Sequence, residues 1–132
     1  MTQKKLLFAM LFVLAFIIGS TGSRAQDGIK RTDLQTHDLS IPGREVVQQM
    51  VELQPGTLVG KHTHPGEEVS VVLEGELRLE VTGKPTVTIK AGQAFTVPPG
   101  VVHSAASEGR VPTKLLATYI VEKGKPLRTA VQ

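Results

Sequence analysis

The stretch GTLVGKHTHPGEEVSVVLEG, residues 56–75, places candidate metal ligands among strand-forming residues. His62 and His64 are separated by one residue, and the carboxylates Glu67 and Glu68 follow a Pro-Gly turn. Residues two apart in a strand point to the same side, so the two histidines are expected to project together. Glu68 has the same parity, but the intervening turn leaves the choice between Glu67 and Glu68 open.

A third histidine, His103, follows the Pro98–Gly100 bend and is the natural partner for the pair. Three nitrogens and one carboxylate oxygen favour a transition metal over magnesium or calcium, which prefer oxygen ligands. The ligand types do not choose among Fe, Mn, Ni, Cu, Co and Zn. The competing interpretation is that His62 and His64 form a polar pair on an exposed strand face.

Short apolar or alternating segments separated by Gly and Pro turns continue through most of the chain. Leu77, Leu79 and Val81 alternate with charged residues, as expected for a strand with one buried face. No amphipathic helix is evident after residue 25, so the pattern predicts an all-β sandwich or barrel. About eight strands are expected, in residues 44–53, 57–59, 69–73, 76–81, 86–90, 93–97, 101–106 and 114–121.

Residues 56–75 resemble the first motif of the cupin superfamily. That motif runs Gly, five residues, His-x-His, three or four residues, Glu, six residues, Gly. The same spacing is found here at Gly56, His62, His64, Glu68 and Gly75.

The second cupin motif runs Gly, five residues, Pro-x-Gly, two residues, His, three residues, Asn. It is matched by Gly92, Pro98–Gly100 and His103, whereas Ser107 stands where the family has Asn. The resemblance implies a single-domain, jelly-roll-like β-barrel, also called a double-stranded β-helix. It also implies four metal ligands, His62, His64, Glu68 and His103, and selects Glu68 over Glu67.

The first 25 residues are typical of an export signal, with a basic start, an apolar core and small residues before Gln26. We therefore expect a periplasmic or secreted protein that meets the membrane only through this signal. Cleavage would remove three of the 15 basic residues and leave 12 against 12 acidic residues. The near-zero net charge argues against nucleic acid as a partner. With no cysteine, any metal site must use nitrogen and oxygen ligands.

The remaining chain is expected to form one domain. Residues 26–43 are interpreted as a mobile arm that could end in an edge strand, residues 44–122 as the barrel, and residues 123–132 as a tail. His37 lies in the arm and is expected to be solvent-exposed. A homodimer is a further expectation, since cupins often pair through edge strands.

Two functions fit this pattern. The first is a metal-dependent, dioxygenase-like enzyme acting on a small organic substrate, with Glu68 and Tyr119 as weak catalytic candidates. The second is a non-catalytic module that binds or senses a metal or small molecule. Strand parity predicts that Ser70, Val72, Val101 and Ala105 line the pocket, with Leu77 and Leu79 in either the core or the pocket wall.

Overall fold

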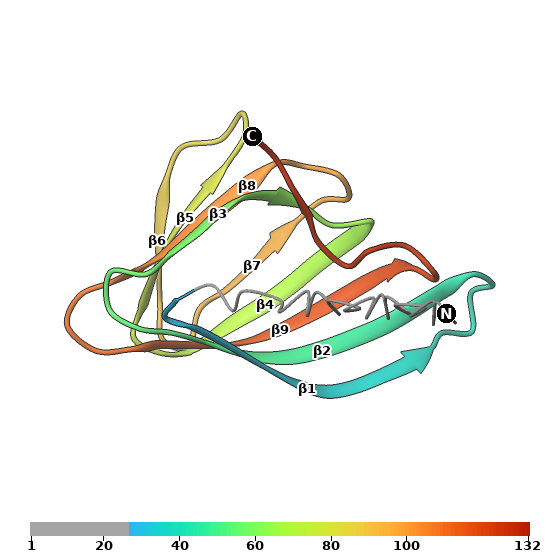
Figure 1. The fold of residues 1–132 in the computed structure, drawn as a ribbon, viewed down its shortest axis with the longest axis horizontal. Coiled ribbons are helices and arrows are strands. Elements are labelled where there is room, and N and C mark those ends of the chain that lie inside the picture. The colour runs from blue at the N-terminus through green and yellow to red at the C-terminus, as the bar shows by residue number, and fades with distance from the viewer. Residues whose placement is uncertain (1–26) are drawn as a thin grey trace, which may run out of the picture.

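The computed structural model describes residues 27–132. The predicted export signal lies outside these residues. Within them, no helix is long and apolar enough to cross a membrane. Figure 1 shows the described chain as two β-sheets that face each other across a barrel interior.

Each sheet has five strands. The first has the order β1-β2-β9-β4-β7, formed by β1 (Ile29–Asp38), β2 (Arg44–Leu53), β9 (Thr113–Glu122), β4 (Gly66–Glu74) and β7 (Ala94–Val97). The second has the order β10-β3-β8-β5-β6, formed by β10 (Thr129–Ala130), β3 (Leu58–Thr63), β8 (His103–Glu108), β5 (Glu76–Val81) and β6 (Val87–Lys90). Each pair of hydrogen-bonded neighbours is antiparallel. The predicted all-β, jelly-roll-like barrel is therefore confirmed.

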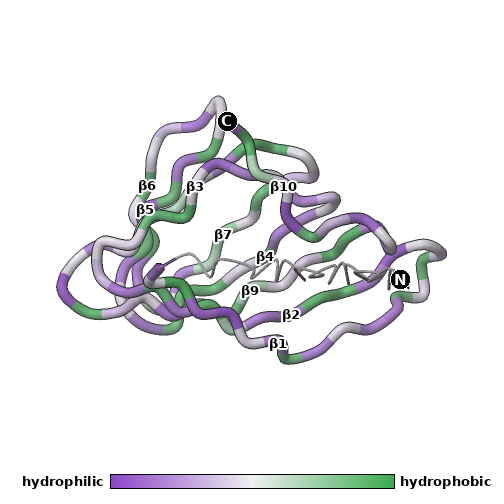
Figure 2. The backbone as a smooth tube through the Cα atoms, viewed as in Figure 1, coloured by the Kyte–Doolittle hydropathy of each residue, from purple (hydrophilic) through white to green (hydrophobic). Residues whose placement is uncertain are grey.

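Strand alternation builds the core between the sheets. Along β9, every second residue from Thr113 to Val121 is buried, and β4 and β5 alternate in the same way. Figure 2 shows the resulting change between hydrophobic and hydrophilic residues along the strands. Apolar side chains removed from water in this way supply the main stabilisation of the fold. The core is formed by Val51, Leu53, Val59, Val72, Leu77, Leu115, Ala117, Tyr119 and Val121.

Two of the ten strands were not among the eight expected. Strand β1 lies at a sheet edge and pairs with β2 from Ile29 to Asp38, although most of its residues are exposed and polar. Strand β10 has two residues and pairs with the end of β3. In Figure 1 the chain leaves β9 and returns across the barrel toward β3, which brings the C-terminal segment beside the histidines. The sequence allows an edge strand only at the end of the arm, and β10 falls within the expected tail, because neither segment shows a hydrophobic period.

Candidate metal centre

The pairing of β3 with β8 brings His62 and His103 together. His62 lies directly opposite His103 in the register of the two strands, and their ring centroids are 4.2 Å apart. The register shifts between Val59 and His62, so that three residue steps on β3 match two on β8. This bulge lets both Val59 and His62 face the interior, which strict alternation would forbid.

His64 and Glu68 complete the group from either side of a turn. His64 follows the last residue of β3, and its ring centroid is 5.1 Å from that of His103. Strand β4 begins at Gly66, so Glu68 falls on its buried face and Glu67 on the opposite one. Of the two carboxylates, Glu68 is therefore the one that lies inside the barrel with the histidines. All four side chains are buried, with exposed fractions between 3% and 5%.

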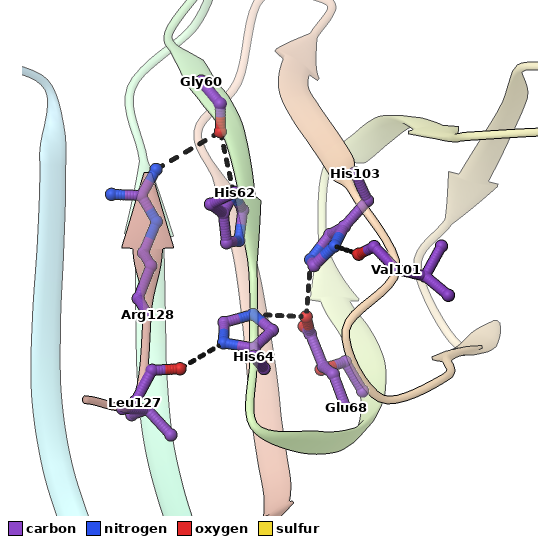
Figure 3. Close-up of polar contacts among 9 residues, drawn as sticks. Gly60, His62, His64, Glu68, Val101, His103, Leu127 and Arg128 are labelled. Carbon is purple, nitrogen blue, oxygen red and sulfur yellow. Dashed lines mark hydrogen bonds and ion pairs between the residues drawn. The ribbon is translucent and has the colours of Figure 1, made fainter. Parts of the chain in front are cut away.

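Three backbone carbonyls orient the three imidazole rings. His62 Nδ1 lies 2.7 Å from Gly60 O, His64 Nδ1 2.6 Å from Leu127 O, and His103 Nδ1 2.9 Å from Val101 O. A carbonyl oxygen can only accept a hydrogen bond, so each Nδ1 carries the proton and donates it. A ring that has its only proton on Nδ1 keeps a lone pair on Nε2, and this is the form that binds metal. Figure 3 shows His64 and His103 reaching Glu68 on their other side.

Glu68 holds a negative charge among these nitrogens. Its Oε2 lies 3.2 Å from His103 Nε2 and 3.3 Å from His64 Nε2, while Ser70 donates a hydrogen bond to Oε1 at 2.8 Å. Burial raises the pKa of Glu68, but the contacts with His103, His64 and Ser70 outweigh it and bring the pKa to about 2. Burial lowers the pKa of His62 to about 3, which keeps that ring neutral.

This arrangement fits a bound cation. A carboxylate oxygen beside imidazole lone pairs is repulsive unless a proton or a metal ion lies between them. His64 Nε2 is buried and has no hydrogen-bond partner among residues 27–132, since its contact with Glu68 lacks hydrogen-bond geometry. The ligand atoms of His62, His64 and His103 all lie within 4.8 Å of one another. These three histidines could therefore hold a metal, and Glu68 as the fourth ligand stays a prediction.

The histidines form part of the wall of a cavity of ≈ 280 Å³. Tyr119 also reaches this cavity, with its ring centroid 4.7 Å from that of His64, and it lies opposite Glu68 in the β4–β9 register. Burial, followed by the charge of Glu68, raises the Tyr119 pKa, so the phenol keeps its proton. The remaining wall is mainly apolar and includes Val51, Leu53, Val59, Leu77, Leu79, Phe95, Ala105, Leu115 and Leu127.

Several of the predicted wall residues lie elsewhere. Ala105, Leu77 and Leu79 line the cavity as parity allowed, but Ser70, Val72 and Val101 do not. Val72 is fully buried in the core, and Ser70 supports Glu68. Parity identifies which face a residue occupies but not its depth along the barrel, and this explains the error.

His37 and Ser107 both lie outside the histidine group. His37 is exposed on β1, as expected, and is not part of the histidine group. Ser107 is buried and its Oγ lies 2.8 Å from Thr113 Oγ1. Sequence reasoning missed Arg31, Gln49 and Arg128, which line the cavity from strands or loops outside both motifs.

Comparison with known proteins agrees with this geometry. Residues 49–119 match the family described as Cupin domain (Cupin_2). Germin-like protein subfamily 2 member 2 of Arabidopsis thaliana is 38% identical over 74 residues, which are 52% of this chain and 34% of that protein. HTH-type transcriptional regulator PuuR of Escherichia coli is 38% identical over 64 residues, 48% of this chain and 34% of that protein.

A solved structure of oxalate oxidase in complex with the substrate analogue glycolate has the same fold. It superposes with a TM-score of 0.65 at 22% identity, over 82% of this chain and 57% of that one. The chain spans about a third of the length of the two curated relatives it matches first. Since the family match includes more than half of the chain together with all three clustered histidines, this protein belongs to the Cupin domain family.

Proposed function

We propose that this protein is a metal-dependent, oxygenase-like enzyme that acts on a small organic substrate inside the barrel. One observation carries the proposal: three clustered, buried imidazoles each have Nδ1 held by a backbone carbonyl, and the Glu68 carboxylate lies beside Nε2 of two of them, His64 and His103. Such pre-orientation of ligands is typical of metal sites. When bound, a transition metal would supply Lewis-acid or redox chemistry to a substrate oxygen atom.

The chain's own residues would bind and orient the substrate. The apolar cavity wall excludes water and accepts a hydrocarbon body. Ser70 fixes the Glu68 carboxylate through its hydrogen bond to Oε1. The Tyr119 hydroxyl has no hydrogen-bond partner among residues 27–132 and keeps its proton, so it is available to donate a hydrogen bond to a substrate atom in the cavity.

Turnover with a metal-loaded sample tests this proposal. We expect protein recovered with its own metal to consume oxygen with at least one of a panel of catechols, flavonols and β-diketones. Tyr119→Phe is expected to lower turnover by about tenfold or more while leaving metal content unchanged, since it removes only a proton donor. Oxygen electrode measurements and elemental analysis of the same samples provide both readouts.

A binding or sensing module is the second candidate. The match to a transcriptional regulator favours it, because that relative is described as a regulator rather than an enzyme. Tight metal retention without oxygen uptake for any member of the panel would contradict the oxygenase-like proposal and support the module.

We also propose that the protein is exported from the cytoplasm and that it forms a homodimer. We expect the protein recovered outside the cytoplasm to begin at Gln26, because the small residues before it suit signal peptidase. Intact-mass spectrometry checks the start of the chain, and light scattering measures the mass of the assembly. Recovery of the full chain in the cytoplasm alone would contradict the export proposal.

A further inference from the structure

Two arginines that belong to neither motif line the cavity that contains the three histidines. Arg31 comes from edge strand β1, opposite Val51 in the register with β2, and Arg128 immediately precedes β10. Both line the same cavity as the three histidines. Figure 3 shows Arg128 beside β3, next to the loop residue Leu127 whose carbonyl holds His64.

Neither guanidinium group has a carboxylate partner among residues 27–132. Arg128 Nη2 donates a hydrogen bond to Gly60 O at 3.2 Å, but its Nε is buried and has no hydrogen-bond partner in the described part of the chain. A buried donor left unpaired carries a desolvation cost, so this atom favours an added acceptor. Asp33 follows on the same face of β1 as Arg31, yet it accepts a hydrogen bond from Gln49 at 2.8 Å and forms no ion pair with Arg31.

The positive charges of Arg31 and Arg128 also repel each other. Burial, and then the charge of Arg31, lower the pKa of Arg128. Two like charges that line the same cavity repel each other, although solvent screens the exposed Arg31. Glu68 cannot relieve this repulsion, because it faces His64 and His103. An anion that contacts both guanidinium groups would do so.

We propose that the ligand of this cavity is a small organic carboxylate, whose carboxylate group binds Arg31 and Arg128 while its body extends along the apolar wall toward the histidines. This inference rests on the proposed function for the metal end of the ligand, but the arginine contact does not require the metal. A guanidinium fork matches both carboxylate and phosphate. The mainly apolar wall offers few partners for additional phosphate oxygens, which favours a carboxylate on a hydrocarbon body.

The cavity limits the size of this ligand. Its volume of ≈ 280 Å³ lies just below the range of about 300–1,000 Å³ that is usual for pockets that bind drug-sized molecules. A short-chain or single-ring acid therefore suits the cavity. Butyrate, succinate and benzoate are suitable probes, each compared with its uncharged amide.

Binding to metal-free protein isolates the arginine contribution. After removal of metal with a chelator, isothermal titration calorimetry should show at least one of the three acids binding about tenfold or more tightly than its amide. Arg128→Gln is expected to weaken the binding of that acid by about tenfold, and Arg31→Gln by a smaller factor because Arg31 is exposed. Neither substitution should change the affinity for the amide. Thermal unfolding of the same samples shows whether each variant is folded, and exposed Arg31 provides the variant least able to disturb the fold.

Arg110→Gln is the matched control. Arg110 is exposed in the loop between β8 and β9 and does not line the cavity, so this variant should bind the acid as the unmodified protein does. Equal binding of acids and amides, unchanged acid affinity in Arg31→Gln, no saturable binding of any acid, or tighter binding of inorganic phosphate would each overturn the inference. Because these titrations use metal-free protein, they can succeed even if the metal-dependent turnover proposed above fails.

Discussion

Alanine in place of His62 or His103 is expected to lower the metal affinity of the protein by more than about 100-fold. Loss of a residue that merely orients a metal ligand costs about 10- to 100-fold, and loss of the ligand itself should cost more. His62 and His103 lie opposite each other on β3 and β8. Either change therefore removes one of the three clustered imidazole ligands. Elemental analysis after dialysis against a weak chelator measures the effect.

Thermal unfolding gives an independent readout of the same change. A metal bound only by the folded state stabilises it by about 4 kcal/mol when its concentration is about 1,000 times the dissociation constant. The unmodified protein should therefore melt at a higher temperature when metal is added, whereas His62→Ala and His103→Ala should not respond. His37→Ala is the matched control, because His37 is exposed on β1 and outside the histidine group. Unchanged metal stoichiometry in both site variants would show that the site is assigned wrongly.

Gly66→Ala is expected to destabilise the fold by about 3 kcal/mol or more, at the upper end of the range for overpacked sites. A Cβ atom at Gly66 would lie 1.9 Å from Ile120 O and 2.7 Å from Val121 Cα. Both atoms belong to the backbone of β9, which pairs with β2 and β4 and cannot move without breaking a ladder. Chemical denaturation measures the loss of unfolding free energy.

The same substitution should also weaken the metal site. Gly66 is two residues before Glu68 on the same face of β4, so a displaced strand start moves that carboxylate away from His64 and His103. Gly60→Ala is the matched control on the other side of the histidine pair. Apart from Gly60 and its two chain neighbours, no heavy atom of residues 27–132 lies within 4 Å of a Cβ built at Gly60, and its φ is not in the left-handed region, so the change should be close to neutral. Equal stability of the two variants would contradict the steric argument.

Much of the fold and part of the site follow from local pattern. Alternation in residues 76–81 predicted a strand with a buried face, and β5 occupies those residues. Strand parity predicted that His62 and His64 project together, the resemblance to the cupin motifs implied His103 as their partner, and the three rings cluster inside the barrel. Local pattern succeeds here because the side-chain period of a strand depends only on backbone geometry.

Long-range pairing decided the rest. Parity placed Ser70 and Val72 on the correct face but not at the correct depth, since depth depends on register with β9 and β7. Strand β1 is mostly polar and β10 has two residues, so no hydrophobic period marked them. These two segments nevertheless bring Arg31 and Arg128 to the cavity.

The sequence by itself determined an all-β chain and the histidines of one candidate metal site, because strand alternation and motif spacing are local properties. The tertiary structure alone decided how the His64 ring is held, since the carbonyl that fixes it belongs to Leu127, 63 residues further along the chain. It also decided the charge of the cavity. Arg31 and Arg128 line the same cavity only because β1 and the segment that precedes β10 both reach it, and no local pattern encodes that placement.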